Sequence, residues 1–116
     1  MAQEAQLWEP GAIPEGLLAA LRSTRKPLIL THIYPDGDAL GSSVALHHCL
    51  AKLGAHPRTI LTHPVPEKLR FIDHDGVAEV LTGEPDASQI SAVEQADLII
   101  VVDPSAFHRL GHMKEL

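Results

Sequence analysis

Three potential metal ligands stand close together in the run His32-Ile33-Tyr34-Pro35-Asp36-Gly37-Asp38. His32 follows a stretch of apolar residues, and Asp36 and Asp38 flank a glycine. The two acids are two positions apart, so their carboxylates can contact different metal ions, which lie about 3.5–4 Å apart in two-metal hydrolytic sites. Imidazole and carboxylate ligands suit Mn²⁺, Fe²⁺, Zn²⁺ or Mg²⁺, and the mixed nitrogen and oxygen set favours Mn²⁺. The run therefore predicts one half of a two-metal hydrolytic site.

A further acid ends the apolar run 97–103, which is the clearest buried strand that the sequence predicts. Asp103 at its end could bridge two metal ions held by Asp36 and Asp38. Acids packed together repel one another and raise their own pKa values, so a bound cation is the simplest way to keep them ionised. Small residues follow the first run, at the expected start of a helix, where N–H groups can bind a phosphate: Gly41, Ser42 and Ser43.

A simple turn and three other motifs are alternative interpretations of this run. An isolated Asp-Gly-Asp is most often a turn. An EF-hand loop that started at Asp36 would need an oxygen ligand and an acid where the chain has Leu40 and His47. The Gly-Lys-Ser/Thr of a P-loop is absent from the sequence. A dehalogenase-type nucleophile would occupy the strand end, where His32 stands. A metal site is the interpretation that accounts for all of the clustered acids.

The elements that must position these residues follow one another as helix and strand. Helices are expected over 13–21, from about Ala39 to Leu53, and over 86–96, where the helical period is weak. Pro14 suits the first turn of the first helix, and Gly54 suits the C-terminal cap of the second. Strands are expected over 27–32, 58–62 and 97–103, and one helical turn before Phe71. The alternation predicts an α/β fold, a parallel sheet with helices on both faces. Ligands of such sheets bind outside the carboxyl ends of the strands, where both acidic runs lie.

Composition limits the alternatives. The 116 residues suit a single domain, and the net charge of −6 argues against a strongly basic nucleic-acid surface. A short phosphorylated substrate is still compatible, because bound metal ions reverse the local charge. Cys49 is the single cysteine, which favours a reducing cytoplasm. No apolar run approaches the roughly 18 residues of a membrane helix and no signal pattern opens the chain, so a soluble protein is expected.

The run 30–42 resembles the first motif of the DHH phosphoesterases of the RecJ-like superfamily, and most closely the nanoRNase and pAp phosphatase branch, with its signature H-x-x-P-D-G-D-A-x-G-S. Residues 101–105 with 109–111 resemble the second motif of that branch, and 66–72 resemble its linking segment. The resemblance covers residues 25–112. It implies a lead-in and helix at 1–24, and the N-terminal portion of a Rossmann-like DHH domain at 25–116.

The resemblance also implies roles for single residues. His32 and Asp36 would hold one Mn²⁺, Asp38 the other, and Asp103 would bridge them, with Mg²⁺ as a possible substitute. Asp38 and Asp103 would be catalytic, and a metal-activated water would attack phosphorus in a short oligoribonucleotide or in 3′-phosphoadenosine 5′-phosphate. A small phosphorylated nucleotide or short RNA or DNA is the expected partner, and a homodimer is a candidate assembly. His108 could contact the substrate phosphate, although a surface histidine is the simpler interpretation.

The sequence also departs from the family pattern. The Asp-His-His motif, a later metal-binding Asp and the substrate domain are expected beyond Leu116, in a longer chain or a partner. The alternative is a truncated, non-catalytic module that binds a metal or a nucleotide. Two histidine-containing runs are not assigned to the site. Asp73-His74-Asp75 is expected to be a surface loop, and His47-His48 is expected to pack or face solvent in the middle of a helix.

Overall fold

The computed structural model describes residues 13–31 and 36–102. Helices and strands alternate along the chain, as the sequence predicts. In order, the elements are α1 (Glu15–Ser23), β1 (Pro27–Thr31), α2 (Gly37–Lys52), β2 (Arg58–Leu61), the 3₁₀ helix η1 (Glu67–Asp73), β3 (Ala78–Val80), α3 (Ala87–Gln95) and β4 (Leu98–Val102).

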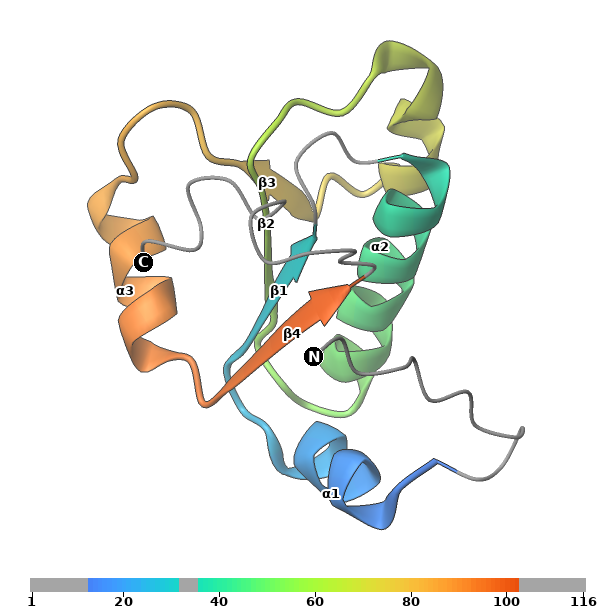
Figure 1. The fold of residues 1–116 in the computed structure, drawn as a ribbon, viewed down its shortest axis with the longest axis vertical. Coiled ribbons are helices and arrows are strands. Elements are labelled where there is room, and N and C mark those ends of the chain that lie inside the picture. The colour runs from blue at the N-terminus through green and yellow to red at the C-terminus, as the bar shows by residue number, and fades with distance from the viewer. Residues whose placement is uncertain (1–12, 32–35, 103–116) are drawn as a thin grey trace, which may run out of the picture.

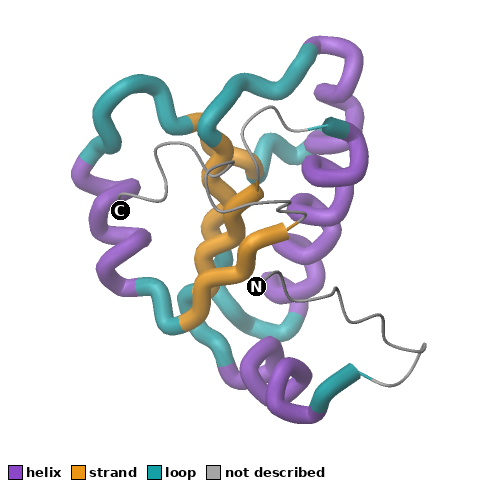
Figure 2. The backbone as a smooth tube through the Cα atoms, viewed as in Figure 1, coloured by secondary structure: helices purple, strands orange, loops and turns teal. Residues whose placement is uncertain are grey.

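The four strands form one parallel sheet in the order β3-β2-β1-β4 (Figure 1). Thr31 of β1 pairs with Val102 of β4, and Leu30 pairs with Ile60 of β2. Parallel neighbours need long crossovers, which the intervening helices supply. Helix α2 lies on one side of the sheet and α3 on the other (Figures 1 and 2). The predicted α/β fold with a parallel sheet is confirmed.

The sheet is most deeply buried at β1, all five residues of which are buried. Its side chains alternate between the two faces, as strand geometry requires. Leu28 and Leu30 pack with Ile60 and Leu81 beneath Val93 of α3. Ile29 points the other way and packs with Leu50 of α2 and partly buried Leu21 of α1. A strand covered on both faces accounts for the continuous apolar run that predicted it.

Helix α2 begins two residues earlier than the predicted start at Ala39. The Asp36 carboxylate accepts a hydrogen bond from the Ala39 N–H at 2.8 Å, and it therefore acts as the N-cap. At the other end, Gly54 has φ 95°, a backbone conformation that favours glycine, so the predicted C-terminal cap is confirmed. The capping aspartate places the first turn of α2 directly after the β1 end of the sheet.

Strand β3 was not predicted. It has three half-buried residues with Glu79 at the centre, too short and too polar to produce a period-two pattern. Tertiary contacts fix it instead. The Asp73 carboxylate accepts hydrogen bonds from the N–H groups of Val77 and Ala78, both at 2.9 Å, and the strand pairs with β2.

The last described strand is shorter than the predicted 97–103. β4 begins at Leu98, because the Asp97 carboxylate is engaged with the turn before β1. Asp103 lies outside the described residues. Within the described ranges, no helix combines the length and apolarity needed to span a bilayer.

Candidate metal centre

The carboxyl ends of β1 and β4 lie side by side at one edge of the sheet. Thr31 and Val102 are register partners, and the Thr31 hydroxyl donates a hydrogen bond to the Val102 carbonyl at 2.9 Å. Thr31 is buried, so this bond ties the two strand ends together away from water. His32 and Asp103 are the next residues in the sequence after this pair, and both lie outside the described residues. The described strand ends therefore agree with the predicted convergence of the two acidic runs.

Asp36 is held in position by the start of α2. Its Oδ1 accepts from the Ala39 N–H, and its backbone carbonyl accepts from the Leu40 N–H at 2.9 Å. Ala39 and Leu40 are fully buried, which anchors this first turn in the core. The carboxylate of Asp36 is consequently oriented by the helix at the edge of the sheet where the ligand site was predicted.

Asp38 lies in the first turn of α2 and is exposed to solvent. Among the described residues it has neither a hydrogen-bond nor an ion-pair partner. The positive end of the helix dipole stabilises its negative charge there. An exposed carboxylate two residues from the oriented Asp36 suits a hard divalent cation, because oxygen ligands are those that Mg²⁺ and Mn²⁺ prefer.

The described ranges supply two of the four predicted metal ligands. They contain no group of three or more histidine, cysteine or acidic side chains arranged to hold a metal ion. The donor set as a whole, one imidazole and three carboxylates, fits a divalent ion of the Mn²⁺ type.

The predicted phosphate-binding residues are placed differently from the expectation. Because α2 begins at Gly37, Gly41, Ser42 and Ser43 lie in its second turn, where helical hydrogen bonds engage the backbone N–H groups. Ser43 is fully buried, and its hydroxyl donates to the Ala39 carbonyl at 2.7 Å. Free N–H groups at these positions were therefore wrongly predicted. Ser42 is exposed, and a Cβ added at Gly41 would meet nothing within 4 Å. Those two residues leave room for a substrate.

The histidine-containing runs that were not assigned to the site have structural roles. His47 Nδ1 lies 2.8 Å from the hydroxyl of the buried Thr59, which joins α2 to β2. Burial, together with the neighbouring His48, lowers the pKa of His47. His48 pairs with Asp75, Nε2 to Oδ2 at 3.6 Å. Asp73 is not in a surface loop as predicted, because it ends η1 and accepts the hydrogen bonds that start β3. His108 lies outside the described residues.

Sequence reasoning missed the role of Asp97. Its carboxylate accepts hydrogen bonds from the Thr24 hydroxyl, from the Arg25 N–H at 2.7 Å and from the Lys26 N–H at 3.2 Å. These bonds, the one from Thr24 first, lower its pKa. They join the start of β4 to the turn before β1. The signal in the sequence was an acid immediately before an apolar run. The predicted strand 97–103 counted this acid as its first residue, so its role as a hydrogen-bond acceptor was not recognised.

The chain is similar in sequence to a known enzyme and in structure to a solved protein. No family model matches the chain. The chain is 27% identical, over 97% of its length, to the bifunctional oligoribonuclease and PAP phosphatase NrnA of Thermus thermophilus, and it covers 37% of that protein. The structure is similar to that of an exopolyphosphatase-related protein from Bacteroides fragilis, with a TM-score of 0.75 and 23% identity. That match covers 87% of this chain and 29% of the other.

These relatives confirm the resemblance and the fold. The chain spans about a third of the length of these two proteins, 37% and 29%. The resemblance to the N-terminal part of an oligoribonuclease and pAp phosphatase of the DHH type, inferred from the motifs, is confirmed by the first relative. The structural neighbour confirms the fold alone.

Proposed function

We propose that this chain is the N-terminal part of a DHH-family phosphoesterase that hydrolyses short oligoribonucleotides, 3′-phosphoadenosine 5′-phosphate, or both. The observation that carries the proposal is the position of Asp36, the N-cap, and Asp38, in the first turn, at the start of the helix that follows β1. The ends of β1 and β4 are paired at the same edge, with Thr31 opposite Val102. This topology supports a site shared by the two acidic runs.

In this proposal His32, Asp36, Asp38 and Asp103 would together hold the divalent ions, with Mn²⁺ as the expected metal. Divalent ions in such a site activate water and stabilise the negative charge that develops on the phosphoryl oxygens. The described residues orient the ligands. The Ala39 N–H fixes the Asp36 carboxylate, and the Thr31 hydroxyl holds the two strand ends together. A substrate phosphate would lie beside Ser42, which is exposed, and Gly41, where an added Cβ would meet nothing within 4 Å.

The test is a hydrolysis assay with Mn²⁺, 3′-phosphoadenosine 5′-phosphate and a dinucleotide, on the longest natural protein that contains this chain. Asp38→Ala and Asp103→Ala are each expected to lower turnover by about 100-fold or more and to weaken Mn²⁺ binding. Asp75→Ala is the matched control, since it also removes an exposed acid, one that pairs with His48. Full activity in either site variant, or no Mn²⁺ binding by the wild type, would contradict the proposal.

The limited span of the resemblance favours a second candidate function. Because the chain covers 37% of the similar phosphatase, residues 1–116 alone are proposed to bind a metal ion or a nucleotide without turnover. Isothermal titration of the 116-residue chain with Mn²⁺ and with adenosine 5′-monophosphate tests this. Binding without hydrolysis supports the module, whereas hydrolysis by the short chain itself excludes it.

A further inference from the structure

A half-open cavity, with polar and apolar side chains in its lining, lies at the opposite edge of the sheet from the acidic runs. Its volume is about 250 Å³, between the amino ends of β1 and β2 and one side of α3. The strands rise about 3.3 Å per residue, so the five residues of β1 separate this cavity from the carboxyl edge by about 13 Å. The polar side chains that line it are those of Lys26, His56, Arg58, Ser88, Ser91 and Gln95.

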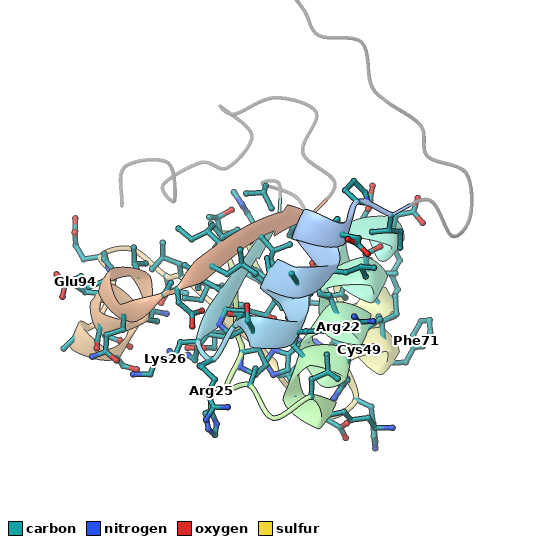
Figure 3. All side chains as sticks on the ribbon, turned by 90° about the horizontal axis from the view of Figure 1, so that it is seen from below. Arg22, Arg25, Lys26, Cys49, Phe71 and Glu94 are labelled. Atoms are coloured by element: carbon teal, nitrogen blue, oxygen red, sulfur yellow. The ribbon has the colours of Figure 1, made fainter. Side chains whose placement is uncertain are left out.

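Two cations reach this cavity from neighbouring strands. Lys26 stands immediately before β1 and Arg58 is the first residue of β2. Figure 3, which looks at the molecule from below, shows Lys26 on the side of the sheet that carries α3. The whole chain has a net charge of −6, so two cations at one cavity contrast with its overall negative charge.

The cations are held by neutral partners on the side of α3. The Lys26 ammonium donates to Gln95 Oε1 at 2.9 Å, and Arg58 Nη1 donates to the Ser88 hydroxyl at 3.1 Å. Glu79 pairs with the other two guanidinium nitrogens of Arg58 and offsets part of its charge. The Lys26 ammonium has three donors, of which the hydrogen bond to Gln95 uses one.

Further donors complete the cavity without a partner of their own. Among the described residues, no hydrogen bond engages the Ser91 hydroxyl or the imidazole of His56. An ammonium, a guanidinium, two hydroxyls and an imidazole together match the several acceptor oxygens of a phosphate group. Pro27 and Ala92 supply an apolar wall beside them. The lining is therefore that of an anion site with room for a small attached group.

We propose that this cavity binds the phosphate group of a small phosphomonoester, at a site separate from the proposed metal centre. Its volume is just below the roughly 300–1,000 Å³ of typical ligand pockets, which suits a phosphate with one sugar rather than a dinucleotide. Lys26 supplies the main charge, and Arg58, Ser88 and Ser91 supply directed donors. A ligand there contacts the first residues of two central strands and one helix, so binding stabilises the fold through them.

Titration of the full-length protein with inorganic phosphate, ribose 5-phosphate and ribose, in the presence of EDTA, tests the proposal. The amide signals of Ser91 and Ala92 in ¹⁵N-labelled protein report on the cavity. Saturable shifts are expected with both phosphates and none with ribose. Tighter binding of ribose 5-phosphate identifies a phosphomonoester as the ligand, and equal binding identifies free phosphate. Both results support the phosphate site.

Variants distinguish phosphate binding at this cavity from non-specific attraction to positive charge on the surface. Lys26→Gln is expected to weaken binding about fivefold or more, and Ser91→Ala about twofold. Arg25→Gln is the matched control, because it removes a neighbouring positive charge that does not line the cavity. Binding affinity in that control should stay within about twofold of wild type at physiological salt, since exposed charges are screened. The proposal is overturned if neither phosphate shifts Ser91 or Ala92, or if Arg25→Gln weakens binding as much as Lys26→Gln.

Discussion

Two aspartates at opposite edges of the same sheet have opposite surroundings. Asp97, before β4, accepts hydrogen bonds from a hydroxyl and two backbone N–H groups. Asp38, after β1, is exposed and has no partner among the described residues. An acid that is saturated by donors of its own chain has a structural role. An acid left without a partner, beside a second acid, has its oxygen lone pairs available for an external cation.

The two edges also differ in the charge they offer. The carboxyl edge carries Asp36 and Asp38 at the start of α2. The amino edge carries Lys26 and Arg58 at the starts of two strands, and the acids there, Asp97 and Glu79, are already engaged by donors of the chain. The direction of the parallel sheet separates them, because all strands begin at one edge and end at the other. One scaffold can thus present a cation site and an anion site without mutual interference.

The largest expected effect comes from the strand that supports both edges. Ile29 of β1 is 0% exposed, whereas Ile99 of the outer strand β4 is 53% exposed. Ile29→Ala is expected to lower the free energy of unfolding by about 2–5 kcal/mol, because it leaves a cavity in the core. Ile99→Ala should change it by about 0.5 kcal/mol or less. Urea unfolding measures both, and equal losses would show that β1 is not the central support.

Asp36 has a structural role, like Asp97, because it caps α2, and a proposed metal-binding role, like Asp38. Substitutions at Asp36 can therefore separate the two roles. Asparagine is as good an N-cap as aspartate, and alanine is a poor one. Asp36→Asn should therefore keep the stability within a few tenths of a kcal/mol, and Asp36→Ala should lose about 1 kcal/mol. Both should lose Mn²⁺ binding. Thermal unfolding and Mn²⁺ titration distinguish the roles. Retained Mn²⁺ binding in Asp36→Asn would remove Asp36 from the metal site.

Asp97 should reveal its structural role through pH. Its hydrogen bonds hold its pKa below the ordinary value of 3.8. Its stabilisation is therefore complete above that value and is lost as the pH falls through the lower pKa of the folded state. Asp97→Asn should unfold at a lower urea concentration than wild type at pH 7, and the difference should shrink in acid. A gap between the two proteins that stays constant down to the lowest pH would contradict this role.

The fold could be predicted because its central elements depend on local pattern. A run such as 27–31 is apolar throughout, since both faces of β1 are covered, and Gly54 ends α2 through its own backbone conformation. Strand β3 could not be predicted in this way. Its three residues are held by Asp73 and by pairing with β2, and these are contacts that only the folded chain provides.

The candidate site was predictable in part for the same reason. Strand direction alone brings the ends of β1 and β4 to one edge, which Thr31 and Val102 confirm. The exact start of α2 depends on whether the Asp36 carboxylate accepts the hydrogen bond from the Ala39 N–H. The residue type at position 36 permits this bond but does not show that it forms. That difference of two residues changed the predicted role of Ser43 from a phosphate ligand to a buried hydrogen-bond donor.

The smallest expected effect concerns His47, which is half-buried against Thr59 and is followed by the half-exposed His48. Burial first, and then the charge of His48, lower the pKa of His47, while Asp73 of η1 and Glu79 of β3 oppose the shift. A histidine with a lowered pKa in the folded state costs stability as the pH falls below its ordinary value of 6.5. His47→Gln should therefore flatten the loss of stability between pH 7.5 and pH 5, measured by urea unfolding. His48→Gln is the control, because its side chain faces Asp75 at the surface. A steeper loss in His47→Gln than in wild type would mean that the charged form of His47 is favoured by the fold after all.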